Sequence, residues 1–165
     1  MKKLIVLLTL VSFGFITKAA NELNVASNNA GKDISYVIVS GKSYFSQEAK
    51  VIFNRIRMHM EGGLVLTIPL RKVDAYSVDG KIFHRLPLAD KRGNEKGSAL
   101  LELVAERGGL RLYRHSLMDK RLGCWFEDNR GNTGMYFVYR GDKYHVSVDE
   151  RNFRTLLPFF GVQTY

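Results

Sequence analysis

Apolar and polar residues alternate over short stretches along most of the chain after residue 33, and glycine-containing turns separate these stretches. Alternation with a period of two is the pattern of a half-buried β-strand. In residues 51–60, Ile56 and Met58 belong to the more apolar parity, which we predict to face the interior, and Arg55 and Arg57 belong to the other. The segments predicted as strands are 36–39, 44–45, 51–60, 64–68, 75–78, 81–84, 110–114, 124–126, 135–139 and 144–148.

Tight turns join several of these segments into antiparallel hairpins. Asp79-Gly80 lies between 75–78 and 81–84, and this dipeptide tolerates the positive φ angles of a two-residue turn. Residues 140–143 separate the last two segments in the same way. The sheet is therefore predicted to be mainly antiparallel.

Residues 98–107 have the pattern of a short helix. Ser98 is a suitable N-cap, and Leu100, Leu101 and Val104 would form one apolar face before two glycines end the segment.

A second helix is predicted at the C-terminus. Asp149 would cap it, and apolar residues follow at helical spacing, namely Phe153, Leu156, Leu157 and Phe160. Pro158 is expected to end or distort this helix near Leu157, because proline lacks the backbone N–H.

These elements together predict an α+β fold. We expect one domain over residues 34–165, with a twisted, mainly antiparallel β-sheet of about six to eight short strands and two short helices packed on it.

Residues 1–20 have the organisation of a secretory signal peptide. Lys2 and Lys3 give a positive start, an apolar run follows over residues 4–16, and small residues at 17–20 fit a cleavage site. The run is shorter than the ~20 residues that span a bilayer, so we expect no permanent membrane span after processing. Residues 21–33 are polar and rich in asparagine, which predicts a flexible mature N-terminus. The protein is therefore expected to be exported to the periplasm, the cell surface or the medium.

The chain is basic, with a formal net charge of +9. Removing residues 1–20 takes away three lysines and no acid, which leaves +6. A basic exported protein is attracted to anionic partners such as lipopolysaccharide, anionic lipid, acidic polysaccharide, extracellular DNA or an acidic protein. The basic residues form no long block, so a solvated surface accounts for most of them.

Cys124 is the only cysteine, so the chain has no intramolecular disulfide. It precedes Trp125, as the nucleophile of papain-like proteases precedes a tryptophan, and His115 or His145 would then have to supply the base. We interpret Cys124 as a small buried apolar residue instead, because two aromatic residues follow it in a strand-like segment.

Motifs for a metal, a cofactor or catalysis are missing from the sequence. The four histidines, His59, His84, His115 and His145, lie far apart and outside any metal-binding motif. The carboxylate pairs Asp74/Asp79 and Glu102/Glu106 have local explanations, with Asp79 in a turn and the two glutamates on an exposed helix face. Arg140-Gly141-Asp142 is a tripeptide that integrins recognise, but it also suits a hairpin turn. We therefore expect no cofactor.

Basic and aromatic residues interleave in the C-terminal half, in segments that one sheet would bring together. Tyrosine and arginine on a sheet face can stack on sugars and bind carboxylate, sulfate or phosphate groups. The candidate ligand surface consists of Tyr113, Arg114, His115, Tyr139, Arg140, Lys143, Tyr144 and His145. The opposing interpretation is a half-buried sheet whose aromatic residues face a helix while the bases face water.

Two function classes remain open. The first is a non-catalytic module that binds an anionic envelope component or a protein partner through this basic face. The second is a small periplasmic or cell-surface hydrolase, with a carboxylate or Cys/His site assembled from distant strands. The first requires that the candidate residues share an exposed surface, and the second requires ionisable side chains that share a cleft.

Four blocks of the sequence stand out together, at residues 74–81, 109–114, 135–139 and 157–161. They resemble blocks in small secreted proteins of Bacteroides-like (Bacteroidetes) bacteria, and the resemblance spans roughly residues 36–162. That family has no established activity, so the resemblance implies a lineage and an exported location and assigns no functional residues.

Overall fold

A computed structural model describes residues 34–90, 92–117, 119 and 122–164. The predictions of a signal peptide at 1–20 and of a flexible segment at 21–33 lie outside the described residues. None of the helices in the described part has the length and apolar character needed to cross a membrane.

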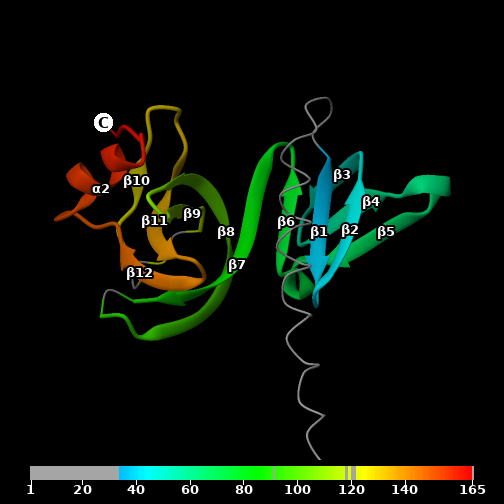
Figure 1. Ribbon diagram of the computed structural model, residues 1–165, viewed down its shortest axis with the longest axis horizontal. Helices are drawn as coiled ribbons and strands as arrows, with labels where there is room; N and C mark the ends of the chain where they lie inside the picture. The colour runs from blue at the N-terminus through cyan, green and yellow to red at the C-terminus, as the bar shows by residue number, and fades with distance from the viewer. Residues whose placement is uncertain (1–33, 91, 118, 120–121, 165) are drawn as a thin grey trace, which may run out of the picture. The chain divides into compact units, whose positions relative to one another are not determined.

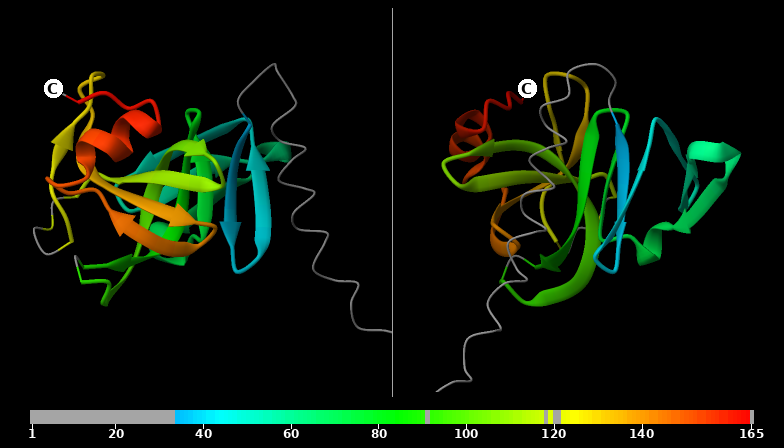
Figure 2. Two further views of the ribbon diagram at one scale, coloured as in Figure 1. Left: turned by 60° about the vertical axis from the view of Figure 1, so that its left-hand side comes forward. Right: turned by 45° about the vertical axis from the view of Figure 1, so that its right-hand side comes forward.

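Most of the described chain forms one large antiparallel sheet of nine strands (Figure 1). The strands along the sheet follow the order β10-β11-β9-β8-β7-β6-β1-β2, and β12 also pairs with β11. Their bounds are β1 Ser35–Val39, β2 Lys42–Ser46, β6 Ala75–Val78, β7 Lys81–Ala89, β8 Glu95–Arg107, β9 Leu110–His115, β10 Phe126–Glu127, β11 Thr133–Arg140 and β12 Lys143–Ser147. Both β7 and β8 curve strongly as they pass from β6 toward β9 (Figures 1 and 2).

A second, three-stranded sheet is inserted between β2 and β6. It contains β3 Glu48–Ile52, β4 Arg55–His59 and β5 Val65–Pro69 in the order β3-β4-β5. Two short 3-10 turns, η1 Glu61–Gly63 and η2 Leu70–Lys72, follow β4 and β5.

The predicted α+β class is wrong, because residues 98–107 are not a helix but most of strand β8. Leucine, alanine and glutamate favour a helix locally, yet β8 pairs with β7 on one side and with β9 on the other. These two ladders satisfy its backbone groups along both edges. The fold is therefore mostly β.

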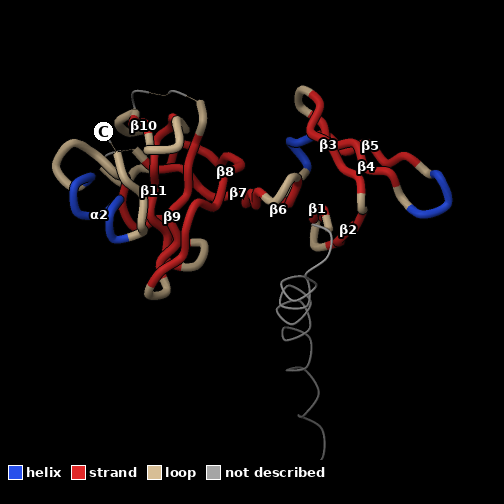
Figure 3. The backbone as a smooth tube through the Cα atoms, turned by 90° about the horizontal axis from the view of Figure 1, so that it is seen from above, coloured by secondary structure: helices blue, strands red, loops and turns tan. Residues whose placement is uncertain are grey.

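The predicted C-terminal helix is confirmed as α2 Phe153–Phe159 and is the only α-helix in the described residues. It differs in its ends: Asn152 is the N-cap, and the helix continues through Pro158. The Asp149 carboxylate instead accepts hydrogen bonds from the backbone N–H groups of Arg151 and Asn152, at 2.9 and 3.2 Å. Figure 3 shows α2 in blue beside the red strands at the C-terminal end of the chain.

The predicted single strand over residues 51–60 is also wrong. The chain turns at Phe53 and Asn54, so β3 and β4 form a hairpin in which Ile52 pairs with Arg55. Across this two-residue turn, even-numbered residues of β3 share a face with odd-numbered residues of β4, as Ile52 does with Arg55. Ile56 and Met58 are buried as predicted, whereas Ile52 is exposed on the other face.

Three apolar clusters stabilise the fold. One joins the inner face of the small sheet to β1 and β6, and it includes Ile56, Met58, Val37 and Tyr76. The other two lie on opposite sides of β9 and β11, because neighbouring residues of β11 alternate between them. Leu157 of α2 belongs to the cluster around Tyr136 and Val138.

Candidate functional site

The eight residues of the predicted ligand surface do not share one exposed surface, and the two central tyrosines are core residues. Tyr113 and Tyr139 are fully buried, with their rings in edge contact at 5.4 Å. The Tyr139 hydroxyl donates a hydrogen bond of 2.6 Å to the Pro87 carbonyl, and the Tyr113 hydroxyl lies 2.7 Å from Nδ1 of His84. Burial raises the pKa of both tyrosines. These two residues therefore hold β9 and β11 to β7.

Arg114 and His115 are also buried, and Arg114 belongs to an ionic cluster. Its guanidinium donates to Glu102 at 2.6 Å and lies 3.8 Å from the carboxylate of Asp128. Nδ1 of His115 is 2.7 Å from the carbonyl oxygen of Leu117. Both side chains have structural partners, so neither is available to a ligand at the surface.

The other four residues lie on β12 and at its turn. Arg140, Lys143 and His145 are exposed. Tyr144 is half-buried, and its ring packs on that of Tyr139 at 5.9 Å. The turn they flank, around Gly141-Asp142, is the predicted hairpin turn.

The residues considered for a hydrolase site are partly buried or paired with neighbouring groups of the chain. Cys124 is half-buried. The Asp74 carboxylate accepts a 2.6 Å hydrogen bond from the Ser40 N–H, and Glu106 pairs with Arg111 at 3.1 Å. Within the described residues, no group of three His, Cys, Asp or Glu side chains is placed to hold a metal ion.

The outer face of the small sheet has a different character. Cross-strand pairing brings Lys50, Arg57 and Thr67 into one row, and Ile52, Arg55 and Pro69 into the next. We call these six residues, together with Phe53 at the hairpin tip, the β3–β5 face. Arg55, Arg57 and Lys50 are exposed there, while the alternating residues of β4 are buried beneath.

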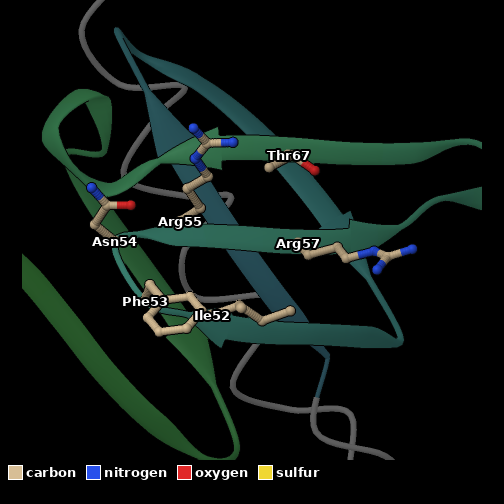
Figure 4. A pocket seen from close by; sticks show the side chains of 6 residues that line it. All are labelled: Ile52, Phe53, Asn54, Arg55, Arg57 and Thr67. Carbon is tan, nitrogen blue, oxygen red and sulfur yellow. The ribbon is translucent and has the colours of Figure 1, made fainter.

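Two depressions that share Asn54 and Arg55 mark this face, and Figure 4 shows the residues that line the larger one. The larger, of about 420 Å³, is lined by Ile52, Phe53, Asn54, Arg55, Arg57 and Thr67. The smaller, of about 180 Å³, is lined by Asn54, Arg55, Pro69 and Arg71. Arg55 therefore lies between the two, and neither depression is lined by a carboxylate, a histidine or a cysteine.

The arginines of this region have no acidic partners. Arg55, Arg57 and Arg71 form no salt bridge within the described part of the chain, although Lys50 lies 3.5 Å from Glu48. Like charges on one face repel one another, and an anion bound beside them would relieve that repulsion. The face is therefore suited to accept an anionic group.

Phe53 is the most unusual residue of the site. It is 97 % exposed, and its φ of +53° lies in the left-handed region, which favours glycine or asparagine. The neighbouring Ile52 pairs with Arg55 and is 43 % exposed, so the hairpin ends in an apolar tip next to the arginines.

Sequence reasoning placed Arg55 and Arg57 on the outward parity but did not identify this site. The signal was present, because arginines alternate with buried Ile56 and Met58. It was missed because the turn at Phe53 was not predicted, and this turn brings Ile52 and Phe53 beside the arginines.

Comparison with protein-family models, with curated proteins and with solved structures gave no match for this chain.

Proposed function

We propose that this chain is an exported, non-catalytic binding module that holds an anionic component of the cell envelope on its β3–β5 face. The observation that carries the proposal is the set of exposed arginines, Arg55, Arg57 and Arg71, which have no acidic partner among the described residues and border two depressions that share Arg55. Export rests on the signal-peptide pattern of residues 1–20.

The chemistry of the face favours phosphate, sulfate or carboxylate groups. A guanidinium offers a planar fork of N–H donors that can bind two oxygens of such a group at once. The hydroxyl of Thr67 and the amide of Asn54 add neutral hydrogen-bonding groups at the edges. The depressions are open and bordered by arginines, which is typical of a binding surface rather than of a site for acid–base chemistry.

The test measures binding of fluorescent dextran sulfate, a soluble polyanion, to the protein purified from cells that express the full-length sequence. The triple variant R55Q/R57Q/R71Q removes the charges of the three arginines that line the depressions. A second triple variant, R92Q/R140Q/R151Q, removes three exposed arginines elsewhere and leaves the same net charge.

We expect the site variant to lose at least about tenfold in affinity, because each arginine that contacts the polymer displaces a counterion. The plot of log K against log salt concentration should become shallower by about two to three units. The control variant should retain most of the affinity. Equal losses in the two variants would mean that net charge alone drives binding, and the proposed site would then be wrong.

A further inference from the structure

We infer that the β3–β5 face docks on the surface of an anionic lipid bilayer, with the Phe53 ring entering the boundary between headgroups and acyl chains. The inference rests on the proposed function, since the same arginines would bind the lipid phosphates. It adds the identity of the partner and a role for the apolar tip.

The first argument is the mixture of exposed apolar and cationic side chains. Ile52 and Phe53 are exposed at one end of the small sheet, and Leu64 and Val65, which are 66 % and 39 % exposed, lie at the other. Exposed apolar groups that cluster beside charges mark an interaction surface. A soluble polysaccharide or a nucleic acid would satisfy the arginines but would leave these aliphatic side chains without an apolar partner.

The second argument is the dimension of the face. Five-residue strands such as β4 are about 17 Å long, so the two apolar ends lie within the width of a few lipid headgroups. Cations between them would meet phosphates in the same plane. Lysine and arginine stems also pack on apolar material while their charges stay in the polar layer.

The third argument is the conformation of Phe53. A phenylalanine in the left-handed region is disfavoured, because its Cβ lies too close to the following carbonyl oxygen. The ring is 97 % exposed and contributes no core packing that would offset this cost. The two-residue turn requires a positive φ at this position but does not require a phenyl ring, so the presence of phenylalanine in place of asparagine or glycine points to a role for the ring in function.

A second copy of the chain fits the face less well. In a symmetric contact the same patch meets itself, so Arg55 and Arg57 of one copy would face the arginines of the other. The repulsion between these like charges opposes such a dimer.

The test is co-sedimentation with two kinds of vesicle, one of phosphatidylcholine alone and one that also contains phosphatidylglycerol. The unaltered protein should bind only the anionic vesicles. Phe53→Asn should weaken that binding at least about tenfold, because it removes the phenyl ring that enters the bilayer. Asparagine accepts the left-handed conformation, so this variant should fold at least as stably as the unaltered protein. Phe45→Thr removes a phenyl ring that is 49 % exposed on β2, and should leave vesicle binding unchanged.

A fluorescence measurement reports the position of the tip directly. The emission of Phe53→Trp, measured as the difference from the unaltered protein with its own Trp125, should shift to the blue with anionic vesicles and stay unshifted with dextran sulfate. Phe45→Trp should not shift with either probe.

The outcomes separate the two proposals. If F53N binds anionic vesicles as well as the unaltered protein, or if Phe53→Trp shows no shift on bound vesicles, the membrane inference is wrong. It is also wrong if the protein binds dextran sulfate but no vesicle, or if it binds an envelope protein instead; the proposed function then stands. If R55Q/R57Q/R71Q binds dextran sulfate normally, the proposed function fails and the inference falls with it.

Discussion

At the scale of single residues, the same residue types have opposite roles in different parts of this protein. Arg114 is buried and paired with Glu102 and Asp128, whereas Arg55 is exposed and has no acidic partner among the described residues. The difference arises because each arginine has different neighbours on the adjacent strands, and the sequence alone does not show which strands pair. For this reason, the sequence indicated that basic residues and tyrosines lie on neighbouring strands, but it could not show which of them are buried in the core.

Gly134 makes the burial of Arg114 possible. A Cβ at this position would lie 2.6 Å from Cγ of Arg114 and 2.8 Å from the carbonyl oxygen of His115. We predict that Gly134→Ala displaces the Arg114 side chain and lowers the free energy of unfolding by about 1–3 kcal/mol, as measured by urea denaturation.

Gly123→Ala is the matched control for this substitution. Its Cβ would meet its neighbours only at 3.9–4.0 Å, which is ordinary contact. The control should change stability by less than about 1 kcal/mol. An unchanged stability of Gly134→Ala would contradict the close packing described for Arg114.

At the scale of elements, local patterns identified hairpins well and failed where long-range pairing decides the structure. The hairpin at Asp79-Gly80 is confirmed, with φ of +53° and +71° at these two residues. Residues 98–107 contain good helix formers, and only pairing with β7 and β9 makes them a strand. The turn at Phe53 was missed because phenylalanine rarely adopts positive φ.

Two loops share a sequence pattern, Asp-x-Arg-Gly-Asn, and the same hydrogen bonds. In residues 90–94, which precede β8, the Asp90 carboxylate accepts from the backbone of Arg92 and Asn94 at 2.9 and 3.0 Å. Asp128 accepts from Arg130 and Asn132 at 2.9 and 2.8 Å in the loop before β11. Each loop also has a glycine at positive φ. The conformation of each loop therefore depends on the hydrogen bonds that its aspartate carboxylate accepts.

This dependence predicts a loss of stability in acid. Burial disfavours the charge of Asp128, but hydrogen bonds from Asn132 and Arg130 and the charge of Arg114 outweigh it, so its pKa lies below the ordinary 3.8. Hydrogen bonds, chiefly from Asn94, lower the pKa of Asp90 to about 2. The folded state therefore binds these protons less readily than the unfolded state, and the stabilisation is complete above the ordinary pKa and is lost as the pH falls through the lowered values.

The measurement is urea denaturation between about pH 6 and pH 2. Asp128→Asn removes the charge, so the variant should be less stable at neutral pH and should lose less further stability on acidification. The control Asp142→Asn changes an exposed turn residue and should follow the unaltered protein. Identical pH curves for Asp128→Asn and the unaltered protein would contradict the role of this carboxylate.

At the scale of the whole molecule, the mainly antiparallel sheet was predictable and the fold class was not. Alternation and turn residues indicated nearly every strand, but the number of sheets depends on which hairpins pair, and that is a long-range property. The predicted binding surface was placed on β9, β11 and β12, whose aromatic residues instead fill the core. The arginines that line the two depressions belong instead to β4 and η2.

The measurement that tests the central claim most directly is residue-resolved NMR of the protein titrated with dextran sulfate. The account predicts that backbone amide shifts concentrate in residues 50–57, 67 and 71, and that they diminish with added salt. Shifts that concentrate instead at Arg140, Lys143 and His145, or that spread evenly over all exposed basic residues, would contradict the assignment of anion binding to the β3–β5 face.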